Sequence, residues 1–178
     1  MKITSTKRYI WDAPKERQIK YLNYLFSRRS TTIDKSRYRV IKNIFQSASG
    51  IKLDDLDTTA RKRLITKLFY FKFKNSCSNA KYVRAGKKKG YENVKFLLGE
   101  WSSIIRNLKK YRPDLVKLGV EICENYIENG FNGAYAPVVH RIGGKGSNYD
   151  WNNITIITKK EHDELTKQER QAQKITNT

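Results

Sequence analysis

VVHRIGGKGSNYDWNNITIITKKEH, residues 138–162, contains both histidines of the chain, His140 and His162. The β-branched run that reaches His140 predicts a strand, and the glycine-rich segment 143–148 predicts a turn. The alternating segment 152–158 predicts a second strand, and the polar run 159–175 predicts a helix. We therefore expect a small strand–loop–strand–helix (ββα) unit that carries one histidine on its first strand and one near the start of its helix.

The sequence before this unit has a helical pattern. Apolar residues recur at helical spacing in five segments: 12–29, 31–48, 57–76, 91–111 and 113–130. Segment 91–111 has the clearest amphipathic pattern, whereas the alternation in FYFKFK (69–74) also permits a strand. We predict an α+β fold, mostly α, in which a basic helical body (1–130) precedes the ββα unit (131–178).

The charge of the chain points to a polyanionic partner. Its 37 Lys and Arg residues exceed its 17 Asp and Glu residues and give a net charge of +20 at pH 7. Nucleic acid is the first candidate, because neutralising phosphates releases counterions and increases affinity. An anionic membrane surface and a merely solubilising surface are the alternatives, although solubility normally needs far less charge.

The remaining composition restricts the setting. No apolar run approaches the ~20 residues of a membrane span, and the first residues lack the apolar core of a signal peptide. Cys77 and Cys123 form no CxxC pair and read as reduced thiols that pack as small hydrophobic residues. These features predict an intracellular protein that does not enter a membrane.

The ββα segment resembles the HNH, or ββα-metal, endonuclease family over about residues 134–170. The resemblance lies in His140-Arg141-Ile142, a glycine-rich turn, and Tyr149, Asn153 and His162 at the spacing of a His-Arg-Ile variant of that family. It implies a small, basic nuclease of the kind found in phages and mobile elements. It also implies one divalent metal ion, Mg²⁺ or Mn²⁺.

The resemblance implies roles for the site residues. A histidine on the first strand acts as general base, the asparagine orients the site, and a residue near the helix start ligates the metal. Here His140 either activates water or binds metal, Asn153 orients the site, and His162 ligates the ion. Arg141 would grip the phosphate, a role that its planar, permanently charged guanidinium suits.

The chain departs from the common family pattern at several positions. If His140 is the base, Val139 occupies the ligand position, and if His140 is the ligand, Arg141 occupies the base position. Thr158 and Glu161 stand where many relatives carry the second CxxC pair of a structural zinc site. We therefore expect no structural zinc.

The lysine- and arginine-rich clusters are the candidates for contacts with the nucleic-acid backbone. They are Arg61, Lys62 and Arg63, then Lys87, Lys88 and Lys89, and finally Lys145 in the glycine-rich turn. For each cluster, a solvated helix face or loop is the alternative interpretation.

The sequence predicts a metal-dependent endonuclease of the HNH type, with DNA favoured over RNA as its substrate. One alternative is a nucleic-acid-binding protein on the same scaffold without catalysis. Another is a phage factor that binds the nucleic-acid machinery of the host. The oligomeric state is left open by the sequence.

Overall fold

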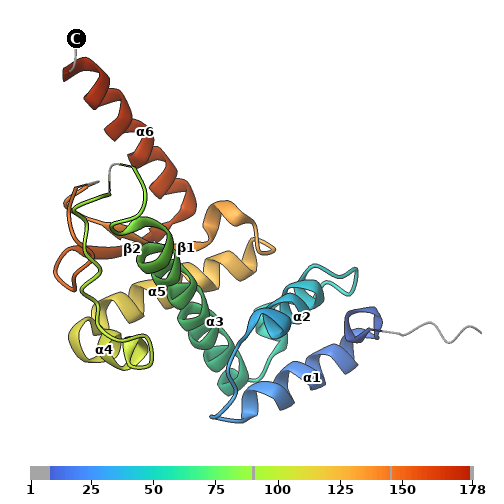
Figure 1. Cartoon of the computed structure of the whole chain (residues 1–178). Helices are drawn as coiled ribbons and strands as arrows, with labels where there is room; N and C mark the ends of the chain where they lie inside the picture. Colours follow the sequence, from blue (N-terminus) through green and yellow to red (C-terminus); the bar gives the residue numbers. More distant parts are fainter. Residues whose placement is uncertain (1–8, 90, 145, 177–178) are drawn as a thin grey trace, which may run out of the picture.

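The computed structural model describes residues 9–89, 91–144 and 146–176 of the chain, without the side chains of residues 170 and 173–176. Helices α1 and α2 lie at one end of the molecule, and the β-hairpin and α6 lie at the other, with α3 running between the two ends (Figure 1). The fold is α+β and mostly α, as the sequence predicts.

The helical body contains α1 to α5, whose bounds are Lys15–Ser27, Lys35–Phe45, Thr58–Asn79, Ile104–Tyr111 and Pro113–Glu128. Short 3₁₀ turns occur at Ile10–Asp12, Leu53–Asp55 and Gly133–Tyr135. Helix α3 contacts α1, α4 and α5, and its Leu64, Leu68 and Phe69 are fully buried. Segment 69–74 is helical, because its aromatic residues pack against neighbouring helices on more than one side.

Helices α3 and α5 approach closely where Gly119 of α5 faces Phe69 of α3. A methyl group on Gly119 would overlap the Phe69 ring, so the missing side chain is what lets the two helices meet. This close packing fixes the position of α5, which in turn supports the second strand of the hairpin.

The prediction of one long helix over 91–111 is wrong in its first half, because α4 begins only at Ile104. The preceding segment instead pairs with the hairpin loop: Leu97 N donates to Tyr149 O (2.8 Å) and Tyr149 N donates to Lys95 O (2.9 Å). Gly99 has a positive φ of 90°, which a continuous helix does not permit. Leu97, expected on the buried stripe, is 52% exposed as a result.

The ββα unit consists of β1 (Pro137–Arg141), β2 (Ile154–Thr158) and α6 (Lys159–Thr176). The strands are antiparallel, and His140 pairs with Thr155. Because side chains alternate along a strand, Val139 and Arg141 point into the protein and His140 points to the other face. The predicted order of strand, loop, strand and helix is confirmed.

The hydrophobic core continues across residue 130, where the sequence divides body from unit. Phe131 packs edge-to-face on Tyr126 of α5, with ring centroids 5.1 Å apart, and Val139 N donates to Ser76 Oγ of α3 (3.0 Å). The ββα unit is thus joined to the helical body by shared packing. Among the described residues, no helix combines the length and apolar character that crossing a bilayer requires.

Candidate active site

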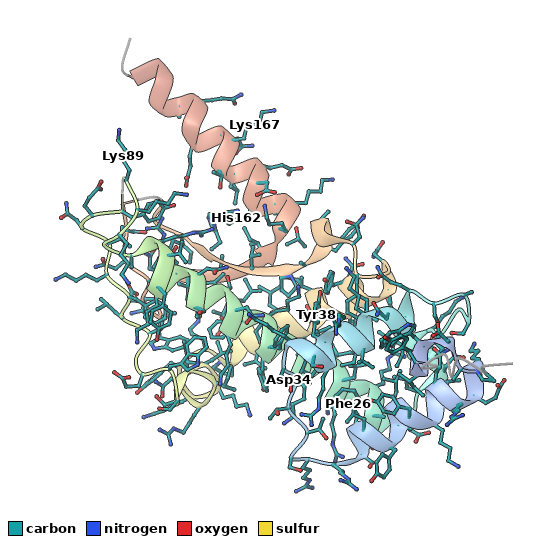
Figure 2. The ribbon with its side chains drawn as sticks, turned by 45° about the vertical axis from the view of Figure 1, so that its right-hand side comes forward. Phe26, Asp34, Tyr38, Lys89, His162 and Lys167 are labelled. Carbon is teal, nitrogen blue, oxygen red and sulfur yellow. The ribbon has the colours of Figure 1, made fainter. Side chains whose placement is uncertain are left out.

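His140 and His162 are brought into direct contact. His140 comes from β1 and His162 from the first turn of α6, and their ring centroids are 5.5 Å apart with an interplanar angle of 88°. Figure 2 shows His162 at the base of α6, on the side of the hairpin. The tight pairing of β1 with β2, followed at once by α6, brings together two residues that are distant in sequence.

Both imidazoles lie in surroundings that favour the neutral form. Burial is the largest cause that lowers the pKa of His140, and the positive forms of His162 and Arg141 lower it further, while Glu169 raises it. Burial also lowers the pKa of His162; the hydrogen bond with Asp163 opposes this, and nearby Arg84 adds to it. At neutral pH both rings are therefore able to accept a proton or to ligate a metal.

Asn153 holds the loop between the strands. Its Oδ1 accepts a hydrogen bond from Gly143 N (2.8 Å), and its Nδ2 donates to Ser147 Oγ (2.8 Å) and Asn148 O (2.6 Å). Its backbone carbonyl accepts from Ile142 N (2.9 Å). These contacts fix the turn that follows His140, so Asn153 acts on the site by positioning backbone.

Arg141 does not occupy the place that the sequence suggested. It is 6% exposed, and its guanidinium lies between the rings of Tyr91 and Tyr149, 4.8 Å from each centroid. Its Nη1 also donates to Ser147 O (2.6 Å). The expectation that Arg141 grips a phosphate is corrected, because strand alternation turns this side chain into the protein.

Thr158 and Glu161, at the positions where relatives carry zinc-binding cysteines, begin α6. Thr158 N and Thr158 Oγ1 both donate to Glu161 Oε2 (2.8 Å each), and Glu161 N donates to Thr158 Oγ1 (3.2 Å). This reciprocal arrangement is a capping box. It fixes the start of the helix at Lys159, three residues before His162.

The donors available to a metal ion at this site are mainly imidazole nitrogens. Within the described residues, no group of three or more His, Cys, Asp or Glu side chains is arranged to hold an ion. Asp163 Oδ1 lies 3.5 Å from His162 Nδ1, but Asp163 is also paired with Lys159. Imidazole suits zinc, nickel and copper better than magnesium, which prefers oxygen ligands.

Arg84 and Glu169 are the charged residues near the histidines that the sequence analysis missed. Both act on the imidazoles electrostatically, Arg84 on His162 and Glu169 on His140. Glu169 follows His162 at a spacing that puts both on one helix face, so helical periodicity was an available signal. Arg84 had no signal in the sequence, because it reaches the site only through the packing of α3 on β1.

The basic clusters differ in whether their side chains bind other groups of the protein or are exposed. Arg61 forms ion pairs with Asp54 and Glu124, and Arg63 donates to the backbone carbonyls of Phe26 and Ser27, so both bind within the protein. Lys62 is exposed. For Arg61 and Arg63, the expected role as backbone contacts for DNA is therefore corrected.

Lys87, Lys88 and Lys89 are exposed on the loop that follows α3, and Lys89 lies toward the outer end of this loop (Figure 2). Their arrangement leaves them accessible to a polyanion. Lys145, the last of the predicted contacts, lies outside the described residues.

Comparison of the chain with family models, with curated proteins and with solved structures found no match. The function of the site must therefore be inferred from its own residues.

Proposed function

We propose that this protein is a metal-dependent endonuclease of the HNH type that hydrolyses phosphodiester bonds in DNA. The observation that carries the proposal is the contact between His140 and His162 at the junction of β1 and α6. These are the only two histidines of the chain. Their convergence in a ββα unit, beside a loop held by Asn153, supports the roles that the resemblance to HNH endonucleases implies for these residues.

The neutral state of the imidazoles suits the chemistry. Hydrolysis requires a group that takes a proton from water, and a neutral histidine near its ordinary pKa of about 6.5 does this at physiological pH. His140 is either this base or a metal ligand, and both roles need the unprotonated ring that its burial favours. We propose that Arg84, whose charge acts on His162, contacts the phosphate in place of the buried Arg141.

A metal ion fits this site if His140 and His162 hold it and water or substrate oxygens complete its coordination. When bound, the ion supplies positive charge for the scissile phosphate and the leaving oxygen. Because the protein donors are imidazoles, we expect Zn²⁺ or Ni²⁺ to support activity at lower concentration than Mg²⁺.

Nicking of supercoiled plasmid DNA tests the proposal. The wild type is compared with His140→Ala and His162→Ala in EDTA and with each of Mg²⁺, Mn²⁺, Zn²⁺ and Ni²⁺. Gln168→Ala, an exposed change elsewhere on α6, is the matched control. Cleavage that needs metal, is abolished in both histidine variants and persists in the control supports the enzyme. Cleavage that survives in both histidine variants overturns it.

Binding of nucleic acid without catalysis is the second candidate function. Two features of β1 favour it. The strand carries no carboxylate that could ligate a metal beside His140, and its one arginine, Arg141, is buried. Salt-sensitive DNA binding by a wild type that cleaves with none of the four metals would support this candidate instead.

A further inference from the structure

Cationic and aromatic side chains form a continuous row from the surface to the ββα unit. Lys87 Nζ lies 5.9 Å from the ring centroid of Tyr82, and Lys81 Nζ lies 5.5 Å from Tyr82 and 5.9 Å from Phe96. The rings of Phe96 and Tyr149 are 6.2 Å apart. The row ends where Arg141 lies between Tyr149 and Tyr91. We call this row the cation–aromatic ladder.

The two ends of the ladder differ in burial. At the inner end, Tyr149 is 2% exposed and Arg141 is 6% exposed, so these contacts stabilise the fold. At the outer end, Tyr82 is 52% exposed. Both ammonium groups lie near the ~6 Å limit of a cation–aromatic contact with Tyr82. The ladder therefore ends in a half-open aromatic ring with two lysine ammonium groups near it.

The outer end belongs to a backbone feature beside the two histidines. Residues Ala80–Arg84 form a π-helical turn that ends α3, in which Ala85 N donates to Ala80 O (2.9 Å). This turn carries Lys81 and Tyr82 as well as Arg84, whose charge reaches His162. At its inner end the ladder contains Arg141, the residue that follows His140. The row is thus linked to the histidine pair at its outer end through Arg84 and at its inner end through Arg141.

We propose that Tyr82, flanked by Lys81 and Lys87, stacks on the base of an unpaired nucleotide while the lysines neutralise the adjacent phosphates. Every base has a π face, so stacking on tyrosine is tolerant of sequence, and lysines beside the ring supply positive charge for the backbone phosphates. A base inside a duplex is covered on both faces and cannot stack in this way. The inference rests on the nucleic-acid substrate of the proposed function and narrows it to strands with unpaired bases.

Binding measured in EDTA tests this inference without any contribution from cleavage. Fluorescence anisotropy compares a labelled single-stranded oligodeoxynucleotide with a blunt duplex of the same length, and 2-aminopurine in the single strand reports stacking through its quenching. We expect tighter binding of the single strand. Tyr82→Ala should weaken that binding by at least about fivefold and remove the quenching, and Tyr82→Phe should retain both.

Tyr24→Ala is the matched control, because Tyr24 is 60% exposed and has Arg28 over its ring, but lies on α1 at the other end of the molecule. It should leave single-strand binding unchanged. Three results would each overturn the inference. Tyr82→Ala could bind the single strand as tightly as the wild type, the Tyr82 and Tyr24 variants could lose affinity equally, or the wild type could bind both DNA forms equally. An oligoribonucleotide of the same sequence shows which sugar is preferred.

Failure of this inference is distinguishable from failure of the nuclease proposal. Plasmid cleavage together with unchanged binding by Tyr82→Ala overturns the stacking role and leaves the enzyme. Quenching that depends on Tyr82, without cleavage by any metal-loaded form, supports the stacking role and leaves a binding protein.

Discussion

At the scale of single residues, the site combines two imidazoles that contact each other with an amide, Asn153, that holds the adjacent loop. His140 and His162 lie edge to face; the positive form of His162 disfavours protonation of His140, and burial disfavours protonation of both. Asn153 binds Gly143, Ser147 and Asn148. The chemistry of the site and the shape of its loop are therefore separable by mutation.

We predict that the metal-free protein loses stability as the pH falls below about 6.5. Both histidines have a pKa lowered on folding, so the unfolded chain binds more protons in this range and protonation favours unfolding. Their contribution is fully present above the unfolded pKa and is lost toward and through the folded pKa. Urea denaturation from pH 7.5 to 5 measures it, because no other histidine titrates there.

The His140→Gln, His162→Gln double variant is the control for this pH dependence. It should show a much flatter stability profile over the same range. A double variant with the same slope as wild type would contradict the prediction.

Asn153→Ala should destabilise the fold by about 1–3 kcal/mol, because it leaves the Gly143 amide and the Asn148 carbonyl without their partner. Thermal and urea denaturation measure the change. Asn152→Ala, at the exposed neighbouring position, should change stability by no more than about 0.5 kcal/mol. Equal effects at the two positions would show that the loop does not depend on the Asn153 amide.

At the scale of elements, hydrogen bonds to distant segments decide where helices begin. The segment before α4 has apolar residues at helical spacing, yet its backbone pairs with the hairpin loop through Tyr149. Segment 69–74 alternates like a strand, yet it continues α3 because both of its faces find packing partners. In both cases the segment that binds or packs against the element is remote in sequence, so the local periodicity cannot indicate it.

Gly119→Ala should destabilise the protein by about 1–3 kcal/mol through overlap with Phe69, despite the better helix propensity of alanine. Denaturation of the variant measures the loss, and adding Phe69→Leu should recover part of it by making room. Gly133→Ala meets open space and should be close to neutral. Similar stabilities of the Gly119 and Gly133 variants would contradict the close approach of α3 and α5.

At the scale of the whole molecule, the net charge of +20 comes from side chains of two kinds, some bound to other groups of the protein and some exposed. Arg61 and Arg63 bind acidic groups or carbonyls of the protein, whereas Lys87, Lys88 and Lys89 are exposed on the loop at the outer end of the ladder. The net charge is therefore larger than the charge that is accessible to a polyanion. The loop after α3 presents three consecutive exposed lysines, and Lys159 and Lys160 of α6 are exposed within the same helical turn as His162.

Replacing Lys87, Lys88 and Lys89 by Gln should weaken nucleic-acid binding and make it less sensitive to salt. Each lost phosphate contact reduces the slope of log affinity against log salt by about 0.7–0.9, so the triple variant should lose up to about 2–3. Anisotropy titrations from low to high NaCl measure the slope. The Arg61→Gln, Arg63→Gln variant should keep the wild-type slope; a loss there equal to that of the lysine variant would contradict the assignment.

The sequence by itself determined the fold class, the order of the ββα unit and the helix from Pro113, because these depend on local periodicity, turn residues and caps. It also singled out His140, Asn153 and His162. Only the tertiary structure decided that Arg141 is buried, that Arg84 and Glu169 lie near the histidines, and that the segment before α4 joins the hairpin loop. Each of these depends on which remote surface packs against the residue, and a pattern of neighbours along the chain does not contain that information.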